Sequence, residues 1–546
     1  MPRQLDCTQN KDLQIALTLS GGGYRASVFH IGVLSYLYHL KLDDGSRMLD
    51  HVTVVSTVSG GTITGVNYLL ALEKEGSLNM HLAELFEKIK SNNLADKVFE
   101  NLYKKKKNKT LSIIKELANV YNEVFFKDEK QTFSDIKRIV QNSPVHHFSA
   151  YATDISNAMP FRFQAVKDCY KEVVIGNCRQ RIKPEKADTI RIADIVAASS
   201  CFPMVFEPLN YPRDFFDYGE NKERAQTSMQ IQLMDGAIID NQGVDYLFEA
   251  NRQMNDGRGE ENEKGIDFAI ISDAASTSEE DSAVPSESFW QKLIVMILGL
   301  FKYMSINNMQ LTTFIMTILF GGVSLFIWDA CFWYIVFASL SFTSLILTFL
   351  VSLGKWSAPS ALKNSNQYKI PKGLVWKINF LQYHRQLKKR YDSFSKVVST
   401  IMMGHIRKGN LQLVFENTRW INRVIIPRIS ALSSNGDWKQ DNDLSNLMSN
   451  ASQLMGYSDR ASNFHSTLWF SDADKEKNIP EIILACGQFS ICYEIYRWSL
   501  SHKGNQTNIR KVHGQLKSDK MRKKLKQDWE KFKESPNWMI DLKKIN

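Results

Sequence analysis

The chain has 546 residues, of which 44% are hydrophobic and 23% are charged, a composition that is ordinary for a globular protein of one large or several domains. Lys and Arg outnumber Asp and Glu by 68 to 58, so the formal net charge is +10. This excess predicts a polyanionic partner, either nucleic acid or an anionic membrane surface. The first ten residues lack an apolar core, so we expect no signal peptide. His and Cys residues show no metal-ligand spacing, so we expect no metal site.

The first predicted strand, residues 14–19, runs into three consecutive glycines, and a helical pattern follows over 28–42. Glycines at a strand-to-helix turn allow backbone N–H groups to point together at an anion. A nucleotide phosphate is one such anion, but the Gly-Lys-Ser/Thr of a phosphate-binding loop and the G-x-G-x-x-G spacing are both absent. The remaining prediction is an oxyanion hole formed by Gly21, Gly22 and Gly23.

A second strand-to-helix turn follows the apolar, β-branched run at 52–55 and contains Ser59-Gly60-Gly61. A serine between a buried strand and a helix, with small neighbours, has the plan of a nucleophile elbow. The usual pattern is G-x-S-x-G, and here Thr57 replaces the first glycine. An ordinary small-residue turn is the alternative interpretation. Ser59 is therefore a candidate nucleophile, and the β-branched Thr57 raises a question about how tight the turn can be.

Further short apolar runs at 148–153 and 266–272 predict buried strands, and the region 78–141 has apolar residues at helical spacing. Strands that alternate with helices over 1–275 predict an α/β fold, with a mainly parallel sheet and helices on both faces. In such folds ligands bind at the carboxyl ends of the strands. Both glycine-containing turns are expected at that edge.

The third candidate group is Asp235, which ends an alternating run at 229–234 and begins Asp-Gly-Ala-Ile-Ile-Asp-Asn. A hairpin turn is one explanation for its Asp-Gly pair. Together the motifs support another, because four stretches in this order resemble the patatin-like phospholipases and the related group IV cytosolic phospholipases. They are Ser20-Gly21-Gly22-Gly23-x-Arg25, the Ser59 turn, Ala-Ser-Ser-x-x-Pro within 192–203, and the Asp235 turn. They cover roughly the first half of the chain, with weaker similarities near 467–470 and 485–488.

This resemblance implies a Ser–Asp dyad, in which Ser59 attacks an acyl carbonyl and Asp235 accepts its proton. The N–H groups of Gly22, Gly23 and Gly21 would hold the oxyanion, and no metal or organic cofactor is required. Arg25 matches the arginine that group IV enzymes carry after the glycine loop, where it would bind a phosphate headgroup. Its alternative role is an ion pair that orients the loop.

A histidine base is the alternative to the dyad, since α/β-hydrolases use Ser, acid and His in that order. His384, His405 or His465 could complete such a triad with Asp235, although none lies in a recognisable motif. His30 is expected to be structural. The motif residues Asp240 and Asn241 are expected to brace the Asp235 loop.

A long apolar stretch follows a polar linker at 276–288. From 303 to 354 the only ionisable residue is Asp329, and the segments 311–328 and 331–353 are each long enough to cross a bilayer core of ~30 Å. We therefore predict a transmembrane hairpin that interrupts the α/β fold, with a buried core hairpin as the alternative. Lysines on its outer flanks predict two spans with both soluble parts in the cytoplasm.

The predicted organisation has three parts: 1–288 as the first part of a catalytic domain, 289–354 as a membrane segment, and 355–546 as a C-terminal part that completes or covers it. Within the last part, 411–432 is predicted to be helical. A basic amphipathic helix near 521–532 could dock either on a membrane or on the protein's own core.

The function predicted from these observations is a membrane-anchored serine acyl hydrolase that cleaves phospholipid or lysophospholipid esters by a Ser–Asp dyad. Its partners would be membrane phospholipid and the bilayer, with no nucleic acid; the sequence does not determine an oligomeric state. Two alternatives remain: a signal-activated membrane-degrading effector or toxin, and a non-catalytic membrane-bound scaffold that keeps the fold. A disrupted dyad would favour the scaffold, but Ser59 and Asp235 are both present.

Overall fold

The computed structural model divides the chain into two compact units, which we call the sheet unit (1–279 and 401–546) and the helix-pair unit (280–400). Each is described by itself. The residues that the structure describes are 13–104, 112–126, 131–170, 173–203, 205–215, 230–255, 265–275, 306–326, 331–363, 390, 393–394, 396–417, 420, 422–436, 438, 447–501 and 514–545.

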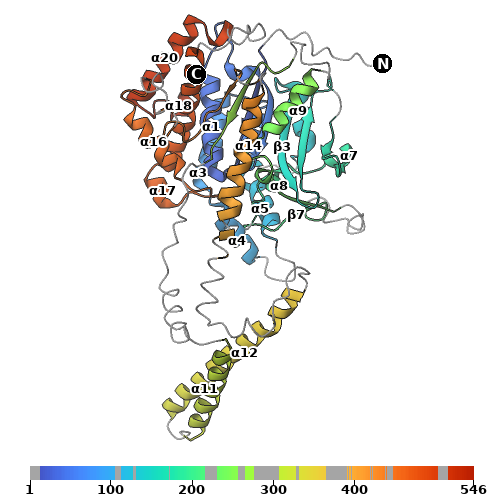
Figure 1. Ribbon diagram of the computed structural model, residues 1–546, viewed down its shortest axis with the longest axis vertical. Helices are drawn as coiled ribbons and strands as arrows, with labels where there is room; N and C mark the ends of the chain where they lie inside the picture. Colours follow the sequence, from blue (N-terminus) through green and yellow to red (C-terminus); the bar gives the residue numbers. More distant parts are fainter. Residues whose placement is uncertain are drawn as a thin grey trace. The chain divides into compact units, whose positions relative to one another are not determined.

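The centre of the sheet unit is a ten-stranded sheet (Figure 1). Its five parallel strands lie in the order β10-β9-β1-β2-β3. They are β10 (Val424–Ile425), β9 (Phe268–Ser272), β1 (Ile15–Leu19), β2 (Val52–Val58) and β3 (His147–Asp154). All are buried along their whole length, as expected for strands covered on both faces. The predicted α/β fold with a mainly parallel sheet is therefore confirmed.

Antiparallel strands complete the sheet on the other side of β3. Strand β4 (Met159–Val166) pairs with β3 along its whole length, while β8 (Ile231–Asp235) pairs only with the carboxyl end of β3, through Ala152 to Asp154. This short pairing brings Asp235 to the edge where the parallel strands end. The remaining strands are β5 (Ile175–Gly176), β6 (Arg181–Ile182) and β7 (Leu209–Tyr211).

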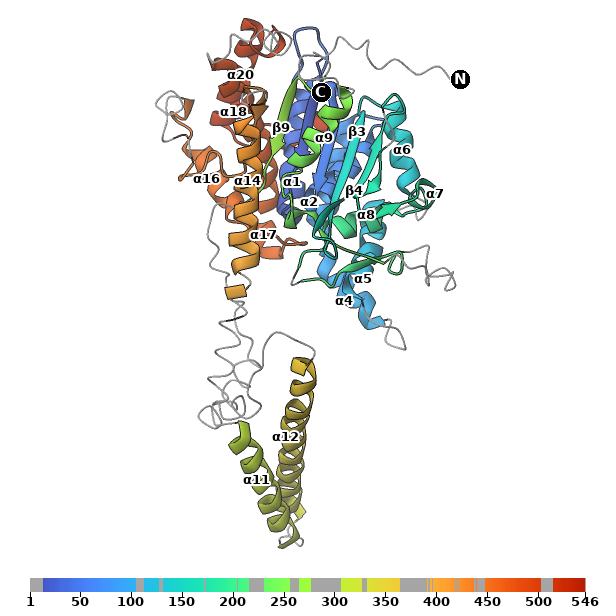
Figure 2. The ribbon, with the colours of Figure 1, turned by 45° about the vertical axis from the view of Figure 1, so that its right-hand side comes forward.

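Helices cover both faces of the sheet (Figure 2). One face packs on α1 (Gly23–His39), α2 (Gly60–Ala71) and α18 (Ile479–Leu500), and the other on α9 (Val244–Met254) and α14 (Met403–Glu416). The region predicted to be helical, 78–141, contains α3 (Leu78–Ser91), α4 (Leu94–Lys104), α5 (Ile113–Tyr121) and α6 (Phe133–Asn142). The other helices are α7 (Pro184–Ala187), α8 (Ile192–Ser199), α16 (Ser452–Ser462), α17 (Asp472–Glu476) and α20 (Asp519–Glu534).

The C-terminal residues are an integral part of the sheet unit. Helices α1 and α18 approach so closely that a Cβ on Gly32 would lie 2.2 Å from the Leu484 carbonyl oxygen, and one on Gly487 would lie 2.1 Å from that of Phe29. The prediction of one helix over 411–432 is wrong in its second half, because residues 424–425 form β10 and extend the parallel sheet. A short β-branched segment that pairs with a distant strand gives no local signal.

The basic amphipathic helix predicted near the C-terminus is α20, and its apolar side docks on the protein's own core. Its residues Met521, Leu525, Trp529 and Phe532 are buried. Trp529 packs on Tyr493 of α18 at a ring-centroid distance of 5.4 Å, and Phe532 packs on Tyr36 of α1 at 5.9 Å. The apolar face is therefore occupied within the sheet unit.

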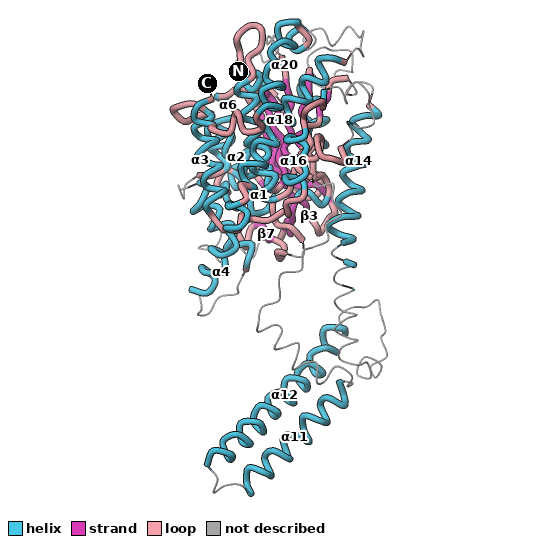
Figure 3. The backbone as a smooth tube through the Cα atoms, turned by 90° about the vertical axis from the view of Figure 1, so that its left-hand side faces the viewer, coloured by secondary structure: helices cyan, strands magenta, loops and turns pink. Residues whose placement is uncertain are grey.

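The helix-pair unit contains α11 (Ile306–Phe326) and α12 (Cys331–Lys363), which lie side by side in all three overall views (Figure 3). Hydroxyl groups connect them: Ser341 Oγ donates to the Thr317 carbonyl oxygen at 3.0 Å, and Ser344 Oγ donates to that of Thr313 at 2.6 Å. Over the residues described in this unit, the structure yields no helix that is both long and apolar enough to cross a membrane. The predicted transmembrane assignment of 311–328 and 331–353 is thus not supported, and Asp329, the linker 276–288 and the segment 289–301 lie outside the described residues.

Candidate active site

Ser59 lies on a sharp turn between β2 and α2, in a strained backbone conformation with φ 50° and ψ −120°. Few non-glycine residues adopt a positive φ, and such strain concentrates at functional sites. The turn needs both following glycines, because a Cβ on Gly60 would lie 2.1 Å from the Gly23 carbonyl oxygen and one on Gly61 would lie 2.2 Å from that of Leu19. The serine turn is therefore packed directly against the glycine loop.

Thr57 fits because the strain falls two residues later. Thr57 belongs to the extended strand β2, and its methyl group occupies the space left by Gly65, where a Cβ would lie 2.3 Å away. Its hydroxyl donates to the Ser149 carbonyl oxygen at 3.1 Å and accepts from Thr62 Oγ1 at 3.1 Å. Threonine at this position thus binds the strand to the helix that follows the turn.

Ser199 holds the turn from the other side, a role that the sequence motifs did not reveal. Its hydroxyl oxygen accepts a hydrogen bond from the Ser59 N–H at 2.9 Å and lies 2.8 Å from the hydroxyl of Thr62. All three residues are buried. The Ala-Ser-Ser pattern at 197–200 was the available signal, but a motif does not say which backbone group its hydroxyl will meet.

Asp235 ends β8, and the structure brings its carboxyl group to the Ser59 hydroxyl, which donates a hydrogen bond to it. The backbone N–H of Ala237 donates to its Oδ1 at 2.8 Å. The Asp235 side chain is 2% exposed, and this burial raises its pKa from 3.8 to about 7, more than the two hydrogen bonds lower it. A carboxyl with a pKa near neutrality suits a general base.

The three glycines of the loop have different roles. The Gly21 N–H donates to the Asn241 carbonyl oxygen at 3.0 Å, so it is already used in holding the glycine loop to the Asp235 turn. The N–H groups of Gly22 and Gly23 have no acceptor among the described residues, and both glycines have positive φ values of 137° and 57°. Two of the three predicted oxyanion donors are therefore available at the start of α1.

Arg25 lies beside the glycine loop but points at the C-terminal part of the chain. Its Nη1 donates to the Phe464 carbonyl oxygen, and its Nη2 donates to Ser466 Oγ at 3.0 Å. The next residue, Thr467, accepts the Tyr24 N–H at 2.8 Å through its carbonyl oxygen. With only 4% of Arg25 exposed, the observed contacts fit the loop-orienting alternative better than direct contact with a headgroup.

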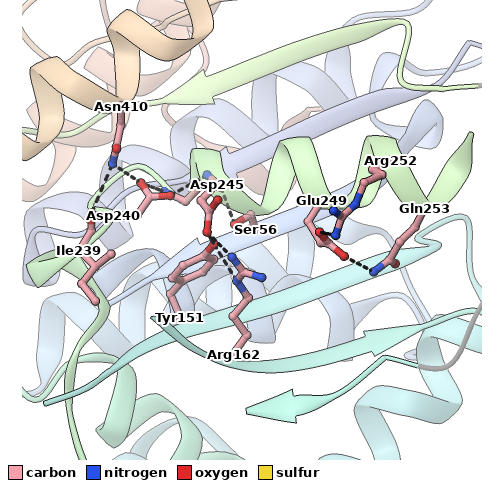
Figure 4. A network of polar contacts seen from close by, with 11 residues as sticks. Ser56, Tyr151, Arg162, Ile239, Asp240, Asp245, Glu249, Arg252, Gln253 and Asn410 are labelled. Atoms are coloured by element: carbon pink, nitrogen blue, oxygen red, sulfur yellow. Dashed lines mark hydrogen bonds and ion pairs between the residues drawn. The ribbon is translucent and has the colours of Figure 1, made fainter. Parts of the chain in front are cut away.

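Asp240 braces the turn that carries Asp235, as the sequence led us to expect (Figure 4). Its Oδ1 accepts from the Gly243 N–H at 2.9 Å and from Asn410 Nδ2 of α14 at 3.0 Å, and its Oδ2 accepts from the Asp245 N–H at 2.7 Å. Burial raises the pKa of Asp240 to about 6. The carboxylate is used entirely within the fold and faces three donors, so its role is to fix the loop.

The histidines do not take part in this constellation. His30 is buried between Ser20 and Ser272, with ring nitrogens 2.9 Å from the Ser20 carbonyl oxygen and 2.8 Å from Ser272 Oγ, and its burial lowers its pKa to about 4. His405 and His465 are exposed, His384 lies outside the described residues, and no described histidine is hydrogen-bonded to Ser59 or Asp235. Nor are three or more His, Cys, Asp or Glu side chains grouped to hold a metal ion in the described part of the chain.

The fold and these contacts define an α/β protein with a serine on a strand-to-helix elbow, a buried aspartate and a glycine loop. Residues 17–248 match the family model of the patatin-like phospholipases, and this part of the chain belongs to that family. No curated protein matches the chain.

Several solved structures match the chain at low identity. Human GIVD cytosolic phospholipase A2 is 15% identical, with 48% of this chain and 43% of that chain covered and a TM-score of 0.31. Its complex with methyl gamma-linolenyl fluorophosphonate is 17% identical, with 41% and 34% covered and a TM-score of 0.25. The aligned region spans less than half of the length of either relative, so the family assignment rests on the match over 17–248.

Proposed function

We propose that this protein is a serine acyl hydrolase that cleaves phospholipid or lysophospholipid esters with Ser59 as nucleophile and Asp235 as general base. One observation carries the proposal: the Ser59 hydroxyl, on a strained turn, donates a hydrogen bond to a buried carboxyl whose pKa is about 7. A serine hydroxyl is a weak nucleophile until a neighbouring base takes its proton. The family match over 17–248 supports the substrate class.

In the first half of the reaction, ionised Asp235 takes the hydroxyl proton while Ser59 Oγ bonds to the ester carbonyl carbon. The negative charge on the carbonyl oxygen is stabilised by the N–H groups of Gly22 and Gly23. The tetrahedral intermediate then collapses, and the alcohol portion of the lipid leaves with the proton from Asp235. Water attacks the acyl-serine in the second half, Asp235 again accepts the proton, and the released fatty acid restores the Ser59 hydroxyl.

We also propose that the outer surface of the helix pair contacts membrane lipid. Large apolar side chains of α11 and α12 are exposed, including Leu325 at 72% and Phe342 at 64%, whereas Thr313 is 2% exposed. Lipid-facing helices have this pattern, with small polar groups between helices and apolar groups outside. The proposal concerns lipid contact only. Two spans and a cytoplasmic catalytic part remain predictions from the sequence.

The test of the hydrolase proposal compares the wild type with Ser59→Ala, using Ser91→Ala as a matched control because Ser91 lies exposed on α3. Free fatty acid and lysolipid released from phospholipid vesicles are measured by mass spectrometry. A long-chain acyl fluorophosphonate serves as a covalent probe of the nucleophile. We expect Ser59→Ala to lose roughly 10⁴-fold in rate and all labelling, while Ser91→Ala keeps both. Wild-type turnover by folded Ser59→Ala would refute the assignment.

A further inference from the structure

Three large apolar side chains of the sheet unit are exposed and come from segments that touch the catalytic groups. Phe99 is 62% exposed, Val205 is 59% exposed and Trp469 is 38% exposed. Single exposed apolar residues are common on soluble proteins, so exposure alone has little meaning. What distinguishes these three is that independent chain segments bring each of them toward Ser59.

Phe99 and Trp469 reach the site through one set of backbone contacts. Helix α4, which carries Phe99, begins with the Leu94 N–H donating to the Leu468 carbonyl oxygen at 3.3 Å. The residue before Leu468, Thr467, accepts the Tyr24 N–H, and a Cβ on Gly23 would lie 2.4 Å from the Thr467 carbonyl oxygen. The start of α4 and the segment 467–470 therefore meet at the proposed oxyanion hole.

Val205 approaches from the opposite side of the serine turn. It follows the segment in which Ser199 accepts the Ser59 N–H and the Cys201 carbonyl oxygen accepts the Asp235 N–H at 2.9 Å. The same segment continues into β7, and Figures 1 and 2 show α4 and β7 at the same end of the sheet unit. Apolar side chains thus flank the site from both sides.

The charge of the chain indicates which surface these residues would meet. The formal net charge is +10, and the sequence continues from the end of α4 as four successive lysines, beginning with Lys104. Lys104 is 66% exposed beside Glu100, and Lys97 is 34% exposed beside Glu123. Exposed aromatic and aliphatic groups on a basic protein favour the interface of an anionic bilayer, where apolar groups enter the headgroup region.

We propose that Phe99, Val205 and Trp469 form an apolar rim by which the sheet unit docks on an anionic lipid bilayer next to Ser59. This inference rests on the proposed hydrolase function and adds where the bilayer sits. The rim is separate from α11 and α12, since all three residues belong to the sheet unit. The helix pair would keep the protein at the membrane, and the rim would turn the site toward its lipid substrate.

The test uses the full chain with Phe99→Ser and Trp469→Ser combined. A matched control combines Met80→Ser and Leu500→Ser, which are 47% and 37% exposed. They lie at the first turn of α3 and the last turn of α18, away from the α4 and α17 ends of these helices. Hydrolysis is measured on phosphatidylglycerol-containing vesicles and on a dispersed short-chain ester. We expect the rim variant to lose about tenfold on vesicles only, because two apolar groups no longer enter the interface. The control should keep both activities.

A second readout does not depend on catalysis. Hydrogen exchange of amides in 94–104 and 467–470 is compared with and without the vesicles, in the Ser59→Ala background. We expect vesicles to slow exchange in these segments for the unmodified rim and not for the rim variant. Unchanged exchange, an equal loss on both substrates, or an equal loss in the control variant would each overturn the rim. Absence of hydrolysis in the wild type, with exchange still slowed, would refute the hydrolase and leave the rim standing.

Discussion

The two units of this protein place polar and apolar side chains in opposite ways. In the sheet unit, large aromatic residues such as Phe29, Trp420 and Trp529 are less than 2% exposed. In the helix pair, Thr313 is 2% exposed, while Leu325 and Phe342 are 72% and 64% exposed. Burial of apolar area drives folding in water, whereas helices in lipid associate through small polar contacts. The contrast indicates that the two units are built for different solvents.

Asp235 is an ionisable exception inside the apolar sheet unit, and its removal should produce the largest effect. We expect Asp235→Asn to lower turnover by about 10³- to 10⁴-fold, and adding Ser59→Ala should worsen this little, because the pair acts as one unit. Wild-type activity should fall as the pH drops below about 7, since only the ionised carboxyl accepts a proton. Steady-state kinetics from pH 5 to 9 give both results. Considerable residual activity in Asp235→Asn would instead point to a histidine base.

The same substitution should stabilise the fold. The folded pKa of about 7 exceeds the ordinary value of 3.8, so the folded state binds the proton more tightly, and stability falls as the pH rises from about 4 to 7. Three pKa units correspond to about 4 kcal/mol, which Asp235→Asn would recover at pH 8. Thermal melting should therefore separate the two proteins more at pH 8 than at pH 5. An equal gap at both values would contradict the raised pKa.

Replacing 303–354 by a flexible linker removes the unit that has its apolar side chains outside. Loop length itself costs little, so we expect the sheet unit to stay folded and to hydrolyse dispersed esters normally. Vesicle binding and vesicle hydrolysis should fall by about 10²-fold, because the helix pair no longer raises the local concentration at the surface. Co-sedimentation and both assays measure this. Undiminished pelleting would show that another surface is the anchor, and a misfolded variant would show that the apolar segment is core.

A pair of glycine substitutions compares the packing of the two units directly. A Cβ on Gly487 would lie 2.1 Å from the Phe29 carbonyl oxygen, so Gly487→Ala should destabilise the sheet unit by about 3 kcal/mol. Gly322 of α11 has no atom within 4 Å of such a Cβ, so Gly322→Ala should leave the protein as stable or slightly more stable. Chemical denaturation measures both. Similar effects would mean that α1 and α18 are not in close contact.

Ser199→Ala gives the smallest predicted effect and tests a purely internal contact. It leaves the Ser59 N–H without its acceptor, so the strained turn is held less firmly. We expect kcat to fall about tenfold with KM nearly unchanged, and fluorophosphonate labelling to slow in proportion. Ser200→Ala is the control, because that hydroxyl contacts Tyr121 and not the serine turn. A change in KM alone would assign Ser199 to substrate binding.

Local patterns were enough to predict the sheet class and to select Ser59 and Asp235 as candidates. Each lies in a short motif at the end of a strand, and strands that are buried along their whole length produce continuous apolar runs. The α/β fold and the family assignment are confirmed. Thr57, which raised doubt, is explained by the space beside Gly65.

Contacts between distant segments could not be predicted in the same way. The sequence offers no means of knowing that the Gly21 N–H is used by Asn241, that Arg25 binds the 464–466 segment, or that 424–425 joins the sheet. Each of these pairings spans more than 150 residues, and its partners become neighbours only in the folded chain. The transmembrane prediction had a strong local basis in an uncharged stretch, yet the described helices do not support it.

The close crossing of α1 and α18 has a consequence for the order in which the protein becomes functional during synthesis. Gln488 Nε2 donates to Ser35 Oγ across a sequence separation of 453 residues. The ribosome therefore completes Ser59, Asp235 and the glycine loop long before it makes the helix that packs beneath them. Contacts of such long range form late and slowly. The nascent chain thus carries its lipid-binding segment before it carries a finished active site, which delays ester cleavage until synthesis is nearly over.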